Sequence, residues 1–382
     1  MDTNKPNKTN DRVQKPKIIT SRVGRWNGEM LKRLGNALKN NPEADMVALL
    51  TPSYSKKLQS LKDSLDEQYL QKHPAKLVPH SQDIRSRLST TDSCTVIFQL
   101  SAEMNALLPE QLSLSEAIVD LLAESEVIYR SEWAAHIMVF KLNENVVVKI
   151  THEEAALTEH SSLVYLDEHL PSFPTPKPHG LVRLGQVYLL FTTFIPGQDL
   201  EKVWPGLSTS KKQSIANQLG GLFATLRSLP RPDTAPLGSV LGDGCKDLRR
   251  GVRKSTEPIM TDLEFQDFLF AGSKTASAPY ITFMRGLMPK SPTQAVFTHG
   301  DVRPANIIVQ EDENGEWKIK SIIDWEASGF YPEYWECIKA TNNMTPRDNT
   351  DWYLYLPHPI SPGSNSAHWL VDRIWDRSMA HS

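Results

Sequence analysis

Two polar motifs joined by a hairpin signal constrain this chain more than any other feature. HGDVRPAN occupies residues 299–306 and IIDWE occupies residues 322–326, and the apolar runs between them flank an Asn-Gly pair at residues 314–315. Asn-Gly between such runs is the strongest short signal for a β-hairpin. Because a hairpin returns the chain to the end from which it started, three oxygen-bearing side chains are predicted to converge: Asp301, Asn306 and Asp324.

Transfer of the terminal phosphoryl group of ATP requires side chains of this kind. A carboxylate orients the acceptor hydroxyl, and Mg²⁺, which prefers oxygen ligands, neutralises the phosphate charge. We therefore expect Asp301 to be the catalytic carboxylate, and Asn306 and Asp324 to hold the metal. Arg303, two residues after Asp301, is placed to offer its charge to the transferring phosphate.

Upstream strands carry a lysine that phosphate chemistry also uses. Apolar or β-branched runs at residues 127–130, 137–142 and 146–150 predict a small antiparallel sheet, followed by a helix over about residues 153–169. Lys149 lies on the third strand, where an unpaired ammonium would be costly. A lysine that pairs there with a helix carboxylate and contacts the α- and β-phosphates is a protein-kinase-like arrangement. The alternative is a lysine whose head reaches solvent at a strand edge.

The sequence resembles the aminoglycoside phosphotransferase and choline kinase-like family, which is part of the protein-kinase-like superfamily. HGDVRPAN and IIDWE carry the resemblance, FIPGQDLEKVW (194–204) and SGFYPEYWE (328–336) add to it, and it extends over about residues 127–355. It implies a bilobal α+β fold, with a small N-terminal sheet lobe that has one helix and a larger, mainly helical C-terminal lobe that carries the catalytic hairpin. It also implies an ATP- and Mg²⁺-dependent kinase that phosphorylates a hydroxyl group of a small molecule.

The resemblance also assigns roles to individual residues. Asp301 matches the catalytic aspartate of the family, and Lys149 matches its phosphate-contacting lysine. Asn306 and Asp324 match the two metal ligands. His299, at the start of the same loop, is expected to buttress it.

The carboxylate partner of Lys149 is less sharply defined by the sequence. Glu159 fits best, because Leu163 and Leu166 follow it in helical phase. Glu153 and Glu154 remain alternatives.

Two segments depart from what the family resemblance implies. The segment between the first two strands, residues 131–136, has no glycine, whereas protein kinases cover the phosphates with a Gly-rich loop. The expected adenine-binding hinge reads LLFTTFIPG and includes Thr192 and Phe194, where the family commonly has a Met-Glu pair near Thr192 and Thr193. Backbone groups usually hold the adenine there, so nucleotide binding is still expected. The glycine-poor segment keeps a non-catalytic nucleotide-binding or scaffold protein as the alternative function.

The part of the chain after the second motif bears on the acceptor. Only 58 residues follow Asp324, and they hold no APE motif, which favours a small-molecule acceptor over a protein. Eight aromatic residues follow within a short distance, and they predict either packing of a helical lobe or a cage for a cationic substrate: Trp325, Phe330, Tyr331, Tyr334, Trp335, Trp352, Tyr353 and Tyr355. Four acidic residues are candidates for binding amino groups, or are solvated charges or structural pairs: Glu326, Glu333, Glu336 and Asp351.

Composition and local patterns predict the organisation of the chain. We expect a flexible polar tail over residues 1–25 and an accessory extension over 26–112, then the N-terminal lobe over 113–195 and the C-terminal lobe over 196–382. Ser113 and Glu116 fit a capping box that begins a short helix.

Charge and cysteine usage exclude several classes of protein. The formal net charge of −3 argues against a chain that mainly coats nucleic acid. The sequence has no long apolar run, so no membrane span or secretory signal is expected. The three cysteines are far apart, which predicts neither disulfides nor a zinc site and favours a reducing, cytoplasmic location. The oligomeric state is left open by the sequence.

Overall fold

The computed structural model describes most of the chain. It covers residues 22–46, 49–50, 54, 56–58, 83–131, 137–247, 253–271, 273, 276–290 and 293–380. The chain divides into two compact units, one formed by residues 1–82 with 132–134 and one by residues 83–131 with 135–382. In the first unit, helix α1 spans Arg22–Asn40, so the last residues of the predicted tail are helical. Residues 1–21 lie outside the described part.

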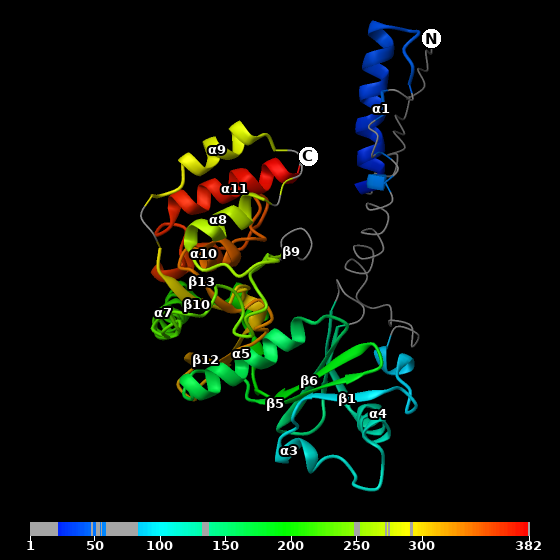
Figure 1. Cartoon of the computed structure of the whole chain (residues 1–382), viewed down its shortest axis with the longest axis vertical. Helices are drawn as coiled ribbons and strands as arrows, with labels where there is room; N and C mark the ends of the chain where they lie inside the picture. Colours follow the sequence, from blue (N-terminus) through cyan, green and yellow to red (C-terminus); the bar gives the residue numbers. More distant parts are fainter. Residues whose placement is uncertain are drawn as a thin grey trace, which may run out of the picture. The chain divides into compact units, whose positions relative to one another are not determined.

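The second unit begins with an antiparallel sheet whose strand order is β1-β5-β6-β4-β3-β2 (Figure 1). The strands are β1 Cys94–Phe98, β2 Glu126–Arg130, β3 Met138–Lys141, β4 Val146–Thr151, β5 Pro178–Leu184 and β6 Val187–Thr193. Apolar side chains of β3, β4 and β6 alternate into the core, where Phe140, Val148 and Leu189 are fully buried. This sheet is the N-terminal lobe.

The N-terminal lobe starts earlier in the chain than the sequence analysis placed it. Strand β1, which was expected to lie in the accessory extension, pairs with β5 through Cys94 and Leu184. Two short helices from the same region, η2 Ile84–Arg87 and α3 Ala102–Asn105, add to the core together with α4 Leu114–Glu124, which lies within the predicted lobe. Ser113 and Glu116 form the predicted capping box at the start of α4. The lobe therefore begins near Asp83, because β1 pairs within the sheet and these helices share its apolar core.

Helix α5 (Ala155–His169) packs against both lobes. Ala156, in its first turn, packs with Leu181 and Leu190 of the sheet. Leu163 and Leu166, two turns later, belong to the core of the second lobe. Figure 1 shows α5 between the sheet and the helical lobe. Both ends of this helix are thereby held by apolar contacts.

The C-terminal lobe is mainly helical and carries short strands. Its helices are α6 Leu200–Val203, η3 Trp204–Gly206, α7 Thr209–Arg227, α8 Asp262–Phe270, α9 Ala278–Gly286, η4 Pro304–Asn306, α10 Trp335–Ala340, η5 Trp352–Tyr355, η6 His358–Ile360 and α11 Ser366–Ala380. Its strands are β7 Gln198–Asp199, β8 Lys246–Asp247, β9 Arg253–Lys254, β10 Ala295–Thr298, β11 Ile307–Glu311, β12 Trp317–Ile322 and β13 Gly329–Pro332. Strands β11 and β12 form the predicted hairpin, with Ile307 opposite Ile322.

The aromatic residues after Asp324 pack the lobe rather than line a cage. Six of them are at most 3% exposed: Trp325, Phe330, Tyr331, Tyr334, Trp335 and Trp352. Tyr353 and Tyr355 pack against the core that contains Trp325, Phe330 and Trp352. A ring buried to this degree cannot present its face to a substrate, so packing accounts for the aromatic cluster.

The bilobal α+β fold predicted from the sequence is confirmed. In the described residues, no helix is both long and apolar enough to cross a membrane. Cys94, Cys245 and Cys337 are free thiols.

Candidate active site

The centre of the site is an ammonium surrounded by three carboxylates. Nζ of Lys149 lies 2.8 Å from Oε2 of Glu159, 2.5 Å from Oδ1 of Asp324 and 3.2 Å from Oε2 of Glu326. Lys149 is on the central strand β4, and Glu159 is in the second turn of α5. The structure thus pairs Lys149 with Glu159. The alternatives Glu153 and Glu154 are exposed at the start of the helix.

The charges of this cluster do not balance. Burial alone would lower the pKa of Lys149, but the carboxylates raise it well above its ordinary value. Burial acts to raise the pKa of Asp324, and Lys149 holds it below the usual value. Burial raises the pKa of Glu159. Lys149 acts to lower the pKa of Glu326, but Asp324 and burial raise it to about 7. Three crowded carboxyls around one ammonium therefore repel one another, and a bound cation would relieve that repulsion.

The β11–β12 hairpin brings Asn306 and Asp324 to the same end, as predicted. The N–H of Ile323 donates to the carbonyl of Asn306 at 2.9 Å, which closes the hairpin immediately before Asp324. Asp324 has a φ of 70°, which among the described residues is the only positive φ outside glycine. Such a conformation costs of order 1–3 kcal/mol, and residues that adopt it cluster at functional sites. Asp324 adopts this conformation where its carboxylate meets Nζ of Lys149.

Asp301, Arg303 and Asn306 form a connected group on the loop before the hairpin. Nδ2 of Asn306 donates to the carbonyl of Asp301 at 2.9 Å and to its Oδ2 at 3.1 Å. Nε of Arg303 lies 3.2 Å from Oδ2 of Asp301, and Nη2 lies 3.9 Å from Oδ2 of Asp324. Burial raises the pKa of Asp301, although Arg303 acts to lower it. Arg303 therefore bridges the two aspartates that the sequence assigned to different roles.

A buried histidine hydrogen-bonds to the backbone of this loop and of the hairpin. Nδ1 of His299 accepts the N–H of Asp301 at 3.1 Å, and Nε2 lies 3.0 Å from the carbonyl of Ile323. The ring is thus neutral, with its proton on Nε2, and burial lowers the pKa of His299 to about 4. Its position between loop and hairpin suits the predicted buttress.

Glu336 of α10 hydrogen-bonds to the backbone of the same loop. Its carboxylate accepts the N–H of His299 at 2.6 Å and the N–H of Gly300 at 3.1 Å. Gly300 has a φ of 82°, and a Cβ there would lie 2.4 Å from the carbonyl oxygen of Ala327, so only glycine fits. Burial raises the pKa of Glu336 to about 7.

Glu326 and Glu336 are site residues that the sequence analysis did not place. Both were candidates, with Glu333 and Asp351, either for binding amino groups or for solvated charges and structural pairs. Asp351 instead accepts from Nε1 of Trp204 at 2.8 Å and from Lys212. The signal for Glu336 was its position within the apolar stretch YWECI, because a carboxylate in such a stretch is buried and therefore partnered.

Thr192 and Phe194 lie at the end of β6, where the hinge was expected. Thr192 pairs with Val147 of β4, two residues before Lys149. The N–H of Phe194 donates to the carbonyl of Asn145 at 2.7 Å, so this N–H does not face a nucleotide. The glycine-poor segment falls mostly on residues 132–136, which lie outside the described part of the chain.

The donor set of the site fits a divalent, oxygen-preferring cation. Ligand atoms of Glu159, Asp324 and Glu326 lie within 4.8 Å of one another. Asn306 uses its amide nitrogen on Asp301, so its amide oxygen is the atom that it can offer to a metal. Carboxylate and amide oxygens with surplus negative charge suit Mg²⁺.

The chain was compared with known proteins. A family model described as the phosphotransferase enzyme family matches residues 124–357. No curated protein matches the chain. Similar solved structures include the aminoglycoside phosphotransferase APH(2")-IIa in a ternary complex with streptomycin and ATP (13% identity, TM-score 0.43, covering 73% of this chain and 91% of that one).

Two further solved structures are similar at the same level. One is an aminoglycoside-3'-phosphotransferase of type VIII (15% identity, TM-score 0.42, covering 66% of this chain and 92% of that one). The other is a putative fructosamine-3-kinase from Haemophilus somnus 129PT (15% identity, TM-score 0.43, covering 68% and 87%). Because the family model spans more than half of the chain, the protein belongs to the phosphotransferase enzyme family.

Proposed function

We propose that the protein transfers the γ-phosphoryl group of Mg²⁺-bound ATP to a hydroxyl group of a small molecule. The observation that carries the proposal is the convergence of Lys149, Glu159 and Asp324 next to the loop of Asp301 and Asn306. A lysine–glutamate pair, a metal-binding aspartate and a separate loop carboxylate are the parts that phosphoryl transfer uses. Family membership supports the same reaction class.

Each side chain has a distinct task in this scheme. Lys149, held by Glu159, contacts the phosphates of the nucleotide, and Asp324 and Asn306 hold the metal, with Glu326 as a further carboxylate nearby. Mg²⁺, when bound, would neutralise charge on the phosphates. Arg303 lies between Asp301 and Asp324, where a transferring phosphoryl group would pass.

Asp301 would orient the acceptor and receive its proton. The acceptor oxygen forms a bond to the γ-phosphorus, and the bond from that phosphorus to the β–γ bridging oxygen breaks, so ADP leaves. The proton of the hydroxyl passes to a carboxylate oxygen of Asp301. Burial raises the pKa of this carboxyl, which makes it a better base than a solvated aspartate.

Nucleotide binding and turnover are tested separately. A thermal-shift titration with ATP, with and without Mg²⁺, should show stabilisation that depends on the metal. ADP release and mass gain should then be followed with a library of hydroxylated metabolites. Metal-dependent ATP binding with no ADP release on any acceptor would favour the non-catalytic alternative, and no ATP binding at all would contradict the proposal.

A further inference from the structure

Helix α1 has an apolar side and a basic side, and the proposed reaction uses neither. Four apolar side chains at intervals of four residues share one side of the helix, and we call them the apolar stripe: Trp26, Met30, Leu34 and Leu38. Lys32 and Lys39 are seven residues apart, so both lie on the opposite side, and both are exposed. The helix is therefore amphipathic, with lysines opposite the apolar stripe.

The apolar stripe is only partly covered in the structure. Its four side chains are half-buried, and Leu31, at the edge of the stripe, is 70% exposed. At the other end of the stripe, Oη of Tyr54 donates to Oδ1 of Asn27 at 2.9 Å. Nζ of Lys57 lies 5.2 Å from the centroid of the Trp26 ring. The stripe thus has neighbours at the Trp26 end and is accessible to an apolar partner at Leu31.

The indole of Trp26 carries a polar group that the described residues do not satisfy. Its Nε1 is buried and makes no hydrogen bond within the part of the chain that the structure describes. Leaving such a group unpaired costs free energy. Tryptophan is enriched at membrane–water interfaces, where the ring lies among apolar chains and the N–H meets polar groups. An interface of this kind would satisfy both parts of the side chain.

Positive charge is concentrated in the same part of the chain. Residues 1–40 contain ten Lys or Arg and three Asp or Glu, whereas residues 41–382 contain 32 Lys or Arg and 42 Asp or Glu. The helix has one carboxylate, Glu29, and five cationic residues: Arg22, Arg25, Lys32, Arg33 and Lys39. A segment with this excess is attracted to a negatively charged surface.

A membrane surface with anionic lipids matches both properties of the helix. Nucleic acid would attract the cations through its phosphates but would leave the apolar stripe without a partner. A helix that lies on a membrane places its apolar side at the boundary between headgroups and acyl chains, and its lysines and arginines are attracted to anionic headgroups. Spanning is a different matter, because no helix among the described residues is long and apolar enough to cross a bilayer.

We propose that α1 binds the surface of a membrane that contains anionic lipids. The apolar stripe and Leu31 enter the lipid, and Lys32 and Lys39 remain at the level of the headgroups. On binding, the Trp26 ring exchanges its contact with Lys57 for lipid. The residues of the active site take no part in this binding, so its failure would leave the proposed reaction untouched.

The first test measures binding of the full chain to vesicles by flotation. One set of vesicles is phosphatidylcholine alone, and the other contains two parts of phosphatidylcholine to one of phosphatidylserine. The protein should float with the second set only, and added salt should release it, because exposed charges are screened. Equal binding to both sets, or flotation with neither, would overturn the proposal. Binding to duplex DNA without flotation would assign the basic charge to nucleic acid instead.

The second test removes the exposed edge of the apolar stripe. Leu31→Glu places a carboxylate where a leucine side chain would enter the lipid, so the apparent affinity for the anionic vesicles should fall about tenfold or more. Leu263→Glu is the matched control, because Leu263 of α8 is 65% exposed and also lies on a helix. It should bind as the wild type does. Wild-type binding by Leu31→Glu, or equal losses in both variants, would contradict the role of α1.

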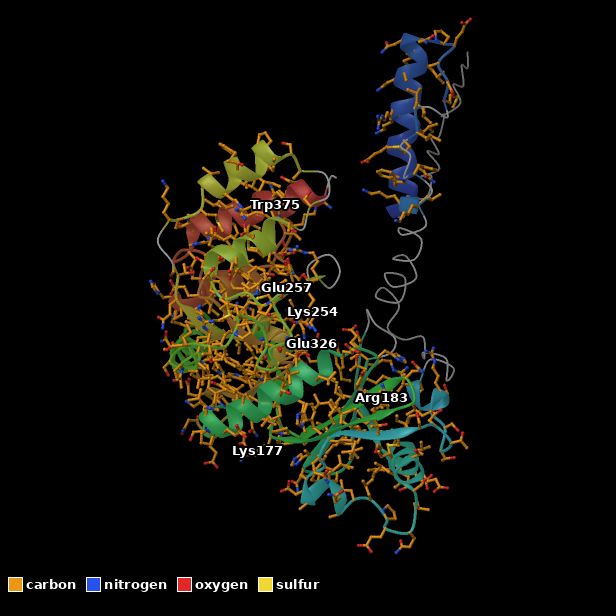
Figure 2. The ribbon with its side chains drawn as sticks, viewed as in Figure 1. Lys177, Arg183, Lys254, Glu257, Glu326 and Trp375 are labelled. Carbon is orange, nitrogen blue, oxygen red and sulfur yellow. The ribbon has the colours of Figure 1, made fainter. Side chains whose placement is uncertain are left out.

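The third test separates the charge from the apolar contact. Changing Lys32 and Lys39 together to Gln should weaken binding to the anionic vesicles about tenfold, and changing both to Arg should preserve it. Lys177 and Arg183, which are exposed cations of the second unit, form the control pair (Figure 2). Changing both to Gln alters the net charge of the chain equally and should leave binding unchanged. Equal losses in the two Gln pairs would mean that overall charge, and not α1, determines the binding.

All variants are compared at one melting temperature. The substituted side chains are exposed, so each variant should unfold at the temperature of the wild type. A loss of binding without a change in melting temperature is then a property of the surface of α1.

Discussion

Nζ of Lys149 lies 2.8 Å from Oε2 of Glu159, which joins the central strand of the sheet to helix α5. The same helix is fixed to the second lobe, where Oγ of Ser328 donates to Oγ of Ser162 at 2.7 Å. Leu163 and Leu166 add apolar contacts to that lobe. The ion pair therefore depends on a helix that both lobes hold in place, so the lysine is preorganised for phosphate binding.

Glu159→Gln should weaken nucleotide binding because it removes the charge that orients Lys149. Asp324 and Glu326 still attract the ammonium, so we expect it to be drawn towards the metal site and away from the phosphates. KM for ATP should rise about tenfold, equivalent to roughly 1.4 kcal/mol. Glu154→Gln is the matched control, since Glu154 is exposed at the start of the same helix. Steady-state kinetics at varied ATP concentration compare the two variants. Equal KM values for ATP in both would contradict a role of Glu159 in orienting Lys149.

Asp324→Asn should weaken the dependence of ATP affinity on Mg²⁺. The amide keeps the size of the side chain and one oxygen but removes the negative charge that a divalent ion requires. The melting temperature should not fall, because Asp324 shares Lys149 with two other carboxylates. Titration of ATP at several Mg²⁺ concentrations is the measurement. If the ATP affinity of the variant depended on Mg²⁺ as in the wild type, Asp324 would not be a principal ligand of the metal.

The sequence predicts which site residues converge where short connections along the chain bring them together. Asp301, Asn306 and Asp324 converge because one hairpin connects them, and the helical phase of Leu163 and Leu166 identified Glu159. Strand β1 was missed because its partner, β5, is far along the chain, with Cys94 opposite Leu184. No local pattern specifies a pairing of that kind.

Glu336 and the aromatic residues illustrate a second limit on what the sequence alone can predict. Glu336 contacts the N–H groups of His299 and Gly300 only because α10 packs beneath the loop, and that packing is tertiary. For Trp325 and Trp335 the sequence left a cage as the alternative to packing, and the fold shows that both are buried. Sequence patterns identify which residues are candidates, whereas burial decides between a ligand-binding role and a packing role.

Glu336→Gln should change how stability depends on pH. Burial raises the pKa of this carboxyl to about 7, above its ordinary 4.5, so the folded state holds a proton that the unfolded state releases. Stability from this group is fully present below pH 4.5 and is lost as the pH rises through about 7. Glutamine does not titrate. The wild type should therefore lose about 2–3 kcal/mol relative to the variant between pH 5 and 8.

Urea denaturation of both proteins across this pH range provides the measurement. Taking the difference between the two cancels the other groups that titrate, including His299, whose lowered pKa destabilises the fold at acidic pH. A difference between wild type and Glu336→Gln that stays constant with pH would show that Glu336 is ionised throughout.

Asp301→Asn should separate binding from turnover. Asp301 neither holds Lys149 nor belongs to the three carboxylates around it, so nucleotide binding should survive. Nδ2 of Asn306 can still donate to the side-chain oxygen of the variant, which preserves the loop. The amide cannot take the proton of the acceptor hydroxyl. Turnover should therefore fall by roughly 10²–10⁴-fold, the range for loss of a positioned general base.

That loss corresponds to about 3–5.5 kcal/mol of transition-state stabilisation. Lys149→Ala should behave differently, because Lys149 would contact the phosphates and its loss should also raise KM for ATP. Glu313→Gln, in the turn of the same hairpin, is the control and should leave both constants unchanged. The kinetics of all three variants are compared on one acceptor. Near-full turnover in Asp301→Asn would mean that the loop is structural, and the non-catalytic alternative would then explain the site better.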